Sequence, residues 1–325
     1  HFYAAIAVAV GSWLSGYFII VTNAFMQHPV GHAIGADGTL RLVDMRAFLF
    51  NPWAVKQYAH NMVATLVTGS FVVAAVGAFY ALREAHKDQA RLYLRTGVVL
   101  GLLSSLLVAF PTGDLQAKAV AKYQPVTLAA MEGRFESGPT AAISMIGQPN
   151  VKAKRLDNPI HIPGVLSFLA YGTFHADVRG LDTFPEDTWP TNIELLYYSF
   201  HMMAGLGTLF IGLMGLSLLF LFRQRLDTTR PLLWALMLAF PFPYIATTAG
   251  WMTAELGRQP WLVYNLYRTS AGYSHKVSAG DTLFTLMGFA GLYFVLGLIY
   301  VFLVGREVMH GPAEERSAGD SYGDE

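Results

Sequence analysis

His60 and Met203 lie in two long apolar stretches of the chain, at similar depth from the same predicted end of those stretches. An imidazole and a thioether that face each other across a flat apolar slot form the axial ligand pair of a low-spin b-type heme. An ionisable side chain at the bilayer centre costs on the order of 3 kcal/mol or more, so His60 is a functional candidate. We therefore predict an iron site between these two stretches.

Each ligand has an alternative explanation. A lone histidine in such a stretch is equally well explained by a hydrogen bond to a neighbouring helix, and methionine commonly fills gaps in apolar cores. His201 and Met202 compete with Met203 as ligands from the same stretch, and Gly205 and Gly207 let either a macrocycle or another helix approach closely.

The segment from 250 to 261 reads Gly-Trp-Met-Thr-Ala-Glu-Leu-Gly-Arg-Gln-Pro-Trp and places a carboxylate and a guanidinium three residues apart. In one interpretation Arg258 is the ion-pair partner of Glu255 at the water interface, where Pro260 ends the helix. In the other, Glu255 binds a metal while Arg258 offsets negative charge on heme propionates or on the carboxylate itself. Trp251, one turn earlier, is placed to pack on a macrocycle or to join an interfacial aromatic belt.

The composition is that of a membrane protein. The chain has 325 residues, of which 54% are hydrophobic and 14% charged, and its mean hydropathy is +0.39, which is too apolar for a soluble domain of this size. A net charge of zero gives no basic surface for nucleic acid. The chain has no cysteine, which excludes disulfides, thiolate metal sites and Cys-linked heme.

We predict an all-α integral membrane protein with six transmembrane helices in a bundle and a long extracytoplasmic loop, because a spanning helix needs roughly 20 apolar residues. The spans are 2 to 24, 54 to 82, 96 to 111, 193 to 222, 231 to 255 and 281 to 304. Residues 1–111 and 193–305 thus carry three helices each, 112–192 form the loop, and 306–325 form a polar tail.

Basic residues set the predicted orientation. They gather in the short loops after the second, fourth and sixth spans, at Arg83, Lys87, Arg91, Arg95, Arg223, Arg225, Arg230 and Arg306. Loops rich in Lys and Arg stay in the cytoplasm, so both termini are predicted to be cytoplasmic and the 112–192 loop to lie outside. Its length, prolines and aromatic anchors favour a functional loop over a flexible linker. His60, Met203 and Glu255 then form one redox layer in the outer half of the membrane.

Four segments, in order, resemble subunit I of cytochrome bd-type quinol oxidases. They are Gly-Ser-Trp-Leu-Ser at 11–15 with Asn-Ala-Phe-Met-Gln-His-Pro-Val-Gly at 23–31, the His60 stretch, the Met203 stretch, and the segment from Trp251 to Trp261. The Glu-x-Gly-Arg-Gln-Pro-Trp run is the most specific of them. A further stretch, from Gln124-Pro125 to Glu132-Gly133, resembles the start of the family's periplasmic quinol loop in its short form.

The resemblance implies a role for each site residue. His60 and Met203 match the axial ligands of the low-spin b heme that takes electrons from quinol. Glu255 matches the carboxylate ligand of a high-spin heme in a di-heme oxygen centre, which Trp251 and Arg258 adjoin. Glu132 matches a carboxylate implicated in quinol oxidation, where a carboxylate beside water can accept one of the two quinol protons. Position 127, where the family usually has Lys, is Thr127.

The resemblance also implies the cofactors, partners and location. The cofactors are a low-spin heme b, a high-spin heme b and a heme d; the substrates are ubiquinol or menaquinol and oxygen. Subunit II, small accessory subunits and membrane lipid are the expected partners, in a bacterial or archaeal cytoplasmic membrane. Members of the family have nine helices in this subunit, and His1 aligns near the start of the fourth, so we expect the oxygen centre to need helices from outside this sequence. The competing hypotheses are a non-catalytic heme-binding subunit or truncated fragment, and a transporter, against which the absence of inverted repeats argues.

Overall fold

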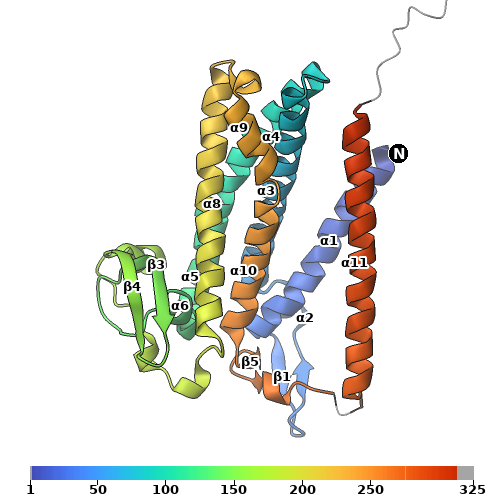
Figure 1. Ribbon diagram of the computed structural model, residues 1–325. Coiled ribbons are helices and arrows are strands. Elements are labelled where there is room, and N and C mark those ends of the chain that lie inside the picture. Colours follow the sequence, from blue (N-terminus) through green and yellow to red (C-terminus); the bar gives the residue numbers. More distant parts are fainter. Residues whose placement is uncertain (1, 275, 313–325) are drawn as a thin grey trace, which may run out of the picture.

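The computed structural model describes residues 2–274 and 276–312 and is mostly helical (Figure 1). Within these residues, six helical segments are long and apolar enough to cross a membrane, which confirms the predicted fold class. They are α1 (Phe2–Gln27); α2 (Met45–Leu49) with α3 (Pro52–Leu82); α4 (Lys87–Leu107) with η1 (Val108–Gly113) and α5 (Asp114–Tyr123); α8 (Ile193–Phe222); α9 (Arg230–Ala239) with α10 (Phe242–Arg258); and α11 (Ala279–His310). Beyond residue 312, the predicted polar tail lies outside the described residues.

The third span runs further than its sequence predicts. We expected it to end at Pro111, but the helix continues to Tyr123. Pro111 lies inside η1, which is a π-helical turn. The wider π turn accommodates a residue that cannot donate a backbone hydrogen bond. The loop therefore begins at Gln124 rather than at residue 112.

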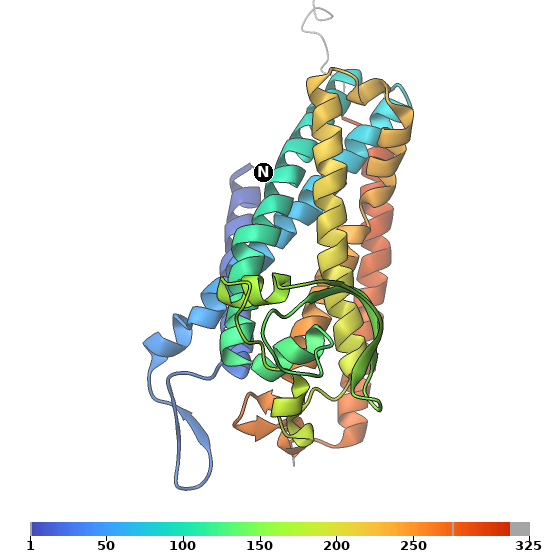
Figure 2. The same cartoon turned by 90° about the vertical axis from the view of Figure 1, so that its left-hand side faces the viewer.

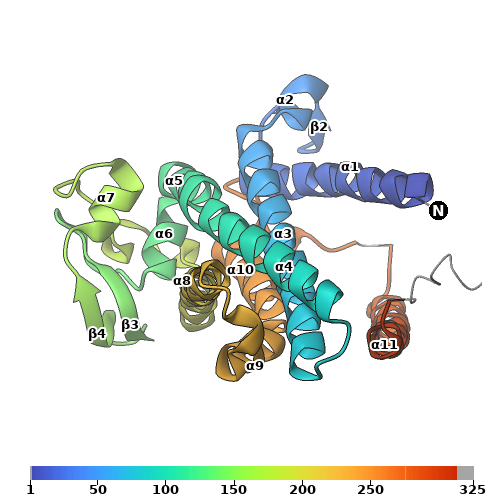
Figure 3. The same ribbon diagram turned by 90° about the horizontal axis from the view of Figure 1, so that it is seen from above.

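Four of the spans form the core of the bundle (Figure 3). The α4 and α10 helices each pack against both α3 and α8, so α3 and α8 lie diagonally opposite. A cluster of buried side chains from α3, α4, α8 and α9 fills one half of this bundle, including Phe71, Leu94, Met214 and Leu236. Pro241 separates α9 from α10 because it has no N–H to continue the helix.

The two ends of the bundle differ in composition. The basic end carries the α3–α4 turn and the 223–230 segment with its short helix η4 (Leu226–Thr228), and an ion pair of 3.2 Å between Arg91 and Asp227 joins them. The loop end carries everything from 124 to 192: α6 (Pro125–Met131), the antiparallel hairpin β3–β4 (Ile143–Asn150 and Arg155–Ile162), α7 (Val165–Tyr171), η2 (Leu181–Thr183) and η3 (Glu186–Thr188). Two smaller hairpins lie at the same end, β1–β2 (His32–Ile34 and Leu40–Leu42) and β5–β6 (Trp261–Val263 and Tyr267–Arg268), followed by η5 (Thr269–Ala271).

The first and last spans are the least covered. In Figures 1 and 3, α11 stands apart from the other helices, and none of its described residues is buried. Its end is linked to the bundle by a hydrogen bond of 3.0 Å from the Tyr80 hydroxyl to the Val308 carbonyl oxygen. These two helices therefore present apolar surface to lipid or to other helices.

Candidate functional site

His60 lies eight residues into α3, about 12 Å from its loop end at 1.5 Å per residue. Asn51 caps the start of the helix by accepting a hydrogen bond of 2.9 Å from the Trp53 N–H. The Nδ1 atom of His60 lies 3.3 Å from the Thr112 hydroxyl in the π turn. Among the described residues Nε2 has no hydrogen-bond partner, so this nitrogen is the one available to a metal, while Thr112 orients the ring.

Met203 lies ten residues into α8, about 15 Å from the loop end, and so at nearly the same depth as His60. Its sulfur packs against α10, where a Cβ at Gly250 would stand only 2.8 Å from Sδ. Gly207 lies one turn further along α8, on the same face as Met203. No atom lies within 4 Å of the position that a Cβ would take at Gly207. An imidazole and a thioether on diagonal helices of a four-helix core fit a low-spin heme, since such cofactors sit between facing helices.

The competing ligands on α8 are less suitable. Both ring nitrogens of His201 face carbonyl oxygens, Nδ1 at 2.8 Å from that of Tyr197 and Nε2 at 2.5 Å from that of Ser144. The side chain of Met202 is half exposed, on a different face from Met203. The geometry therefore favours Met203 over its two neighbours.

Glu255 and Arg258 form an ion pair near the loop end of α10. The other carboxylate oxygen of Glu255 accepts a hydrogen bond of 2.6 Å from the Asn23 side chain on α1. The Arg258 side chain is 5% exposed and that of Glu255 41%, and Arg258 also donates to the Leu262 carbonyl at 2.5 Å. The ion pair of the first interpretation is thus present, but Arg258 is buried rather than at the water interface. The ion pair does not exclude metal binding, because each carboxylate oxygen keeps a second lone pair.

Trp251 lies four residues before Glu255, hence on the same face of α10, and is partly buried. It directly follows Gly250, against which the Met203 sulfur packs. One short stretch of α10 thus touches the Met203 region and carries Trp251, Glu255 and Arg258, which supports a single redox layer.

A set of buried side-chain amides, not predicted from the sequence, joins the segments at the loop end through hydrogen bonds. Gln57 donates to the Asn23 side chain at 2.9 Å, and Gln27 donates to the Ala254 carbonyl at 3.1 Å. Gln124 donates to Gln27. The detectable signal was that uncharged amides are unusual in apolar spans, where each must find a partner.

Glu132 is the most deeply buried carboxylate of the loop. It is 4% exposed, and one of its oxygens has no hydrogen-bond partner among the described residues. Burial raises the pKa of Glu132 to about 8, although a hydrogen bond from the Ser144 backbone opposes this. The charged form is disfavoured because it loses its hydration. Glu132 is therefore a neutral acid near pH 7.

Tyr197 on α8 lies close enough to Glu132 to interact with it electrostatically. Its hydroxyl is likewise buried without a partner among the described residues, and its ring stacks on that of His201 with 3.8 Å between centroids. A buried polar atom without a partner is costly for the fold, so the hydroxyl of Tyr197 and the free oxygen of Glu132 are each candidates for a hydrogen bond to a ligand.

Thr127 stands where the resemblance implies a lysine. It is buried against α10, and its hydroxyl donates to the Gly257 carbonyl at 2.6 Å. Lys122, the nearby basic residue, instead lies over the ring of Tyr123 at 5.0 Å. Neither residue is seen to pair with Glu132.

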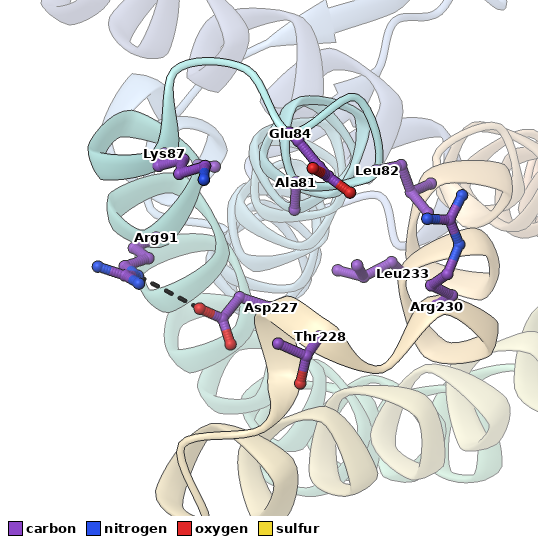
Figure 4. A pocket seen from close by; sticks show the side chains of 10 residues that line it. Ala81, Leu82, Glu84, Lys87, Arg91, Asp227, Thr228, Arg230 and Leu233 are labelled. Atoms are coloured by element: carbon purple, nitrogen blue, oxygen red, sulfur yellow. Dashed lines mark hydrogen bonds and ion pairs between the residues drawn. The ribbon is translucent and has the colours of Figure 1, made fainter.

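A hollow of about 410 Å³ lies at the basic end, away from these residues (Figure 4). It opens between the α3–α4 turn and the start of α9, with Lys87, Arg91, Arg230, Glu84 and Asp227 around it. None of the site residues predicted from the sequence lines it.

Comparison with known proteins identifies the family of the chain. Residues 1–312 match the model of the family described as cytochrome bd terminal oxidase subunit I. The chain is 32% identical over 314 residues to "Cytochrome bd ubiquinol oxidase subunit 1" of Bacillus subtilis, covering 94% of this chain and 66% of that protein. It is 33% identical to "Putative cytochrome bd menaquinol oxidase subunit I" of the same organism, covering 96% and 70%.

Relatives from other bacteria match over a similar range. "Cytochrome bd-II ubiquinol oxidase subunit 1" of Escherichia coli is 27% identical, with 98% of this chain and 74% of that protein covered. The solved structure of the bd oxidase from Geobacillus thermodenitrificans superposes with a TM-score of 0.85 at 30% identity, over 94% of this chain and 69% of that one. The chain thus spans about two thirds to three quarters of the length of these relatives, and it belongs to the cytochrome bd terminal oxidase subunit I family.

Proposed function

We propose that this chain is the heme-bearing subunit of a terminal quinol oxidase, which oxidises quinol at the loop end and delivers the electrons to a di-heme site that reduces oxygen to water. The observation that carries the proposal is the buried Glu132 carboxyl with one free oxygen, next to the helix that bears Met203. Membership of the family and the names of the relatives support it.

Glu132 handles a proton in this proposal. Quinol releases two electrons and two protons when it becomes quinone, and a group with a pKa of about 8 can donate a hydrogen bond when neutral and take up a proton when ionised. The hydroxyl of Tyr197 offers a second hydrogen bond to the same ligand. The surrounding loop excludes bulk water from both groups.

Nε2 of His60 and Sδ of Met203 would hold the low-spin heme b, which would supply one-electron transfer when bound. Thr112 keeps the imidazole in position through Nδ1. Glu255 would hold a high-spin heme, b or d, with Trp251 nearby on the same face of α10, while Asn23 and Arg258 hold the carboxylate in position.

The basic end faces the cytoplasm of a bacterium in this proposal, with both termini on that side, because basic loops are retained there. Ubiquinol or menaquinol, both named among the relatives, is the reductant. The uncovered faces of α1 and α11 leave room for subunit II, small accessory subunits and lipid.

The test is to purify the protein with its natural partners and record reduced-minus-oxidised spectra together with quinol-dependent oxygen uptake. The exposed His175 offers a matched control. His60→Ala should abolish the low-spin b signal and oxygen uptake, while His175→Ala should change neither. Complete absence of heme from the unaltered protein would refute the proposal. A low-spin signal without any high-spin or chlorin signal would favour a non-catalytic heme subunit.

A further inference from the structure

The β3–β4 hairpin lies alongside a membrane-spanning helix rather than above the bundle. Figures 1 and 2 both place it beside the loop-end part of α8, and β3 packs on α8. The Ser144 carbonyl, near the start of β3, lies 2.5 Å from Nε2 of His201. Since His201 is eight residues into α8, this end of the hairpin lies about 12 Å along the helix.

The other end of the hairpin lies before the start of α8. Lys154, in the turn between the strands, forms an ion pair with Glu186 and lies 5.7 Å from the centre of the Trp189 ring. Both partners precede Asn192, which caps the helix. The hairpin therefore runs roughly parallel to α8, with Ser144 toward the middle of the membrane and Lys154 toward water.

The exposed side chains of the hairpin change from apolar at the Ser144 end to charged at the Lys154 end. At the Ser144 end, Met145, Ile146 and Ile160 are 58%, 62% and 55% exposed, and Ile162 is exposed beside them. Ile146 and Ile160 are cross-strand partners. At the Lys154 end the exposed side chains include Lys152, Lys154 and Arg155.

Helix α7 extends the apolar end. The first turn of α7 is hydrogen-bonded to the segment just before β3: the Leu166 N–H donates to the Ala141 carbonyl at 3.1 Å. It exposes Phe168, Leu169 and Tyr171, and Phe168 stacks on the exposed Phe174 at 4.7 Å between centroids. We call the exposed apolar residues of this end, which surround the exposed His161, the apolar platform: Met145, Ile146, Ile160, Ile162, Phe168, Leu169, Tyr171 and Phe174.

We propose that the apolar platform is immersed in the lipid leaflet at the loop end, at the boundary between headgroups and acyl chains. Lipid rather than a protein is the occupant because the apolar-to-charged gradient runs along the axis of the neighbouring spanning helix, as a membrane boundary requires. The boundary fits better than the bilayer centre, since a two-stranded ribbon leaves edge backbone groups that hydrocarbon cannot satisfy. With 30 residues, α8 is about 45 Å long and exceeds the roughly 30 Å hydrocarbon core, so its ends reach this zone.

Single-cysteine labelling tests this directly, because the chain has no cysteine of its own. Nitroxide labels at Ile146→Cys and at Lys152→Cys, on the same hairpin, would be compared in the whole assembly in lipid nanodiscs, with the unsubstituted assembly treated in parallel. We expect the label at Ile146 to collide more with dissolved oxygen than with a polar nickel chelate, and the label at Lys152 to show the reverse. Ile160→Cys repeats the test if Ile146→Cys does not assemble.

Two results would overturn the proposal. Equal nickel access at both positions would place the platform in water, and loss of access to both reagents at Ile146 would show that protein covers it. The measurement needs no turnover, so it is independent of the proposed oxidase activity.

A consequence that does rest on the proposed function is that quinol reaches Glu132 from the bilayer past this platform, since Ser144 of the same strand donates to Glu132. Changing Met145 and Ile146 together to Ser should then lower kcat/KM for a long-tailed quinol several-fold while sparing a water-soluble short-chain quinol. Equal loss for both quinols would contradict the route while leaving the labelling result intact.

Discussion

The side-chain amide of Gln124 donates to the backbone oxygen of Gln27 at 2.8 Å and to its side-chain oxygen at 2.9 Å. Both residues are 1% exposed. This contact fastens the first residue of the loop to the end of α1, and Gln27 continues the connection to α10 through the Ala254 carbonyl. The loop that holds Glu132 is thus attached to the same helices that hold Glu255.

Gln124→Met removes both donated hydrogen bonds while keeping the side-chain volume. The buried oxygens of Gln27 then lose a partner, which costs about 1 to 3 kcal/mol of unfolding free energy. Thermal unfolding of the purified assembly measures the change. The exposed Gln148 provides the control, and Gln148→Met should stay within about 0.5 kcal/mol of the unsubstituted protein. Similar losses for the two variants would mean that the buried amide pair is not a special contact.

A close approach between α6 and α10 gives a second prediction. A Cβ at Gly257 would stand 2.4 Å from the Thr127 methyl carbon, so Gly257→Ala should destabilise the protein by about 1 to 3 kcal/mol through overpacking. Thr127→Ser keeps the hydroxyl that donates to the Gly257 carbonyl and removes that methyl group.

The double variant should therefore recover most of the loss in a thermal unfolding series. Gly212→Ala is the matched control because no atom lies within 4 Å of its Cβ position. Failure of Thr127→Ser to rescue Gly257→Ala would show that the contact does not limit the packing of the two helices.

Much of the fold was predictable because membrane-spanning helices can be recognised in a sequence by their length and hydropathy. The fourth span was predicted at 193–222, which is where α8 lies. The third was predicted too short because a proline ordinarily ends a helix, whereas here a π turn absorbs Pro111. The β3–β4 hairpin could not be predicted, since its strands contain Pro149 and Pro159 and lack strict alternation.

The site was predictable only as a list of residue types. His60, Met203 and Glu255 were selected because such side chains are costly in a membrane span and can bind a metal. The sequence could not distinguish Met203 from His201 as the ligand; in the structure, both ring nitrogens of His201 face carbonyl oxygens. Tyr197 was missed because a tyrosine at a membrane interface has no distinguishing signal. Its importance comes from a tertiary neighbour, Glu132, 65 residues earlier in the chain.

Quinol oxidation should depend on the ionisation of Glu132. Because its pKa is about 8, the proton-accepting form grows as the pH rises toward 8, and kcat/KM for quinol should rise with it. Glu132→Gln should lower the rate by about 100-fold or more and remove this limb of the pH profile. Glu136→Gln, at an exposed position in the same loop, should retain both rate and profile; an unchanged profile in Glu132→Gln would show that another group accepts the proton.

The same residue should make stability depend on pH. Glu132 ionises near 4.5 in the unfolded chain and near 8 in the folded one, so the folded state holds an extra proton between these values. Its contribution to stability is fully present below pH 4.5 and is lost as the pH rises through 8. The midpoint of thermal unfolding should therefore fall less over this range in Glu132→Gln than in the unsubstituted protein, and parallel curves would contradict the assigned burial.

Tyr197→Phe should show whether the Tyr197 hydroxyl stabilises the fold or binds quinol. The hydroxyl has no partner among the described residues, so its removal should not lower stability. If quinol uses it, KM should rise about 5-fold, which corresponds to about 1 kcal/mol for one neutral hydrogen bond. Tyr198→Phe alters the half-exposed neighbour and should leave KM unchanged. A fall in thermal stability of Tyr197→Phe with no change in KM would assign the hydroxyl to the fold.

The most direct test of the central claim, that His60 and Met203 hold a low-spin heme, is the reduced-minus-oxidised absorption spectrum of Met203→Leu beside that of Met202→Leu. Leucine keeps the apolar packing against Gly250 but has no lone pair for iron. We predict that Met203→Leu converts the low-spin b signal to a high-spin one while the protein still inserts in the membrane, and that Met202→Leu keeps the original spectrum. An unaltered low-spin spectrum in Met203→Leu would contradict the account.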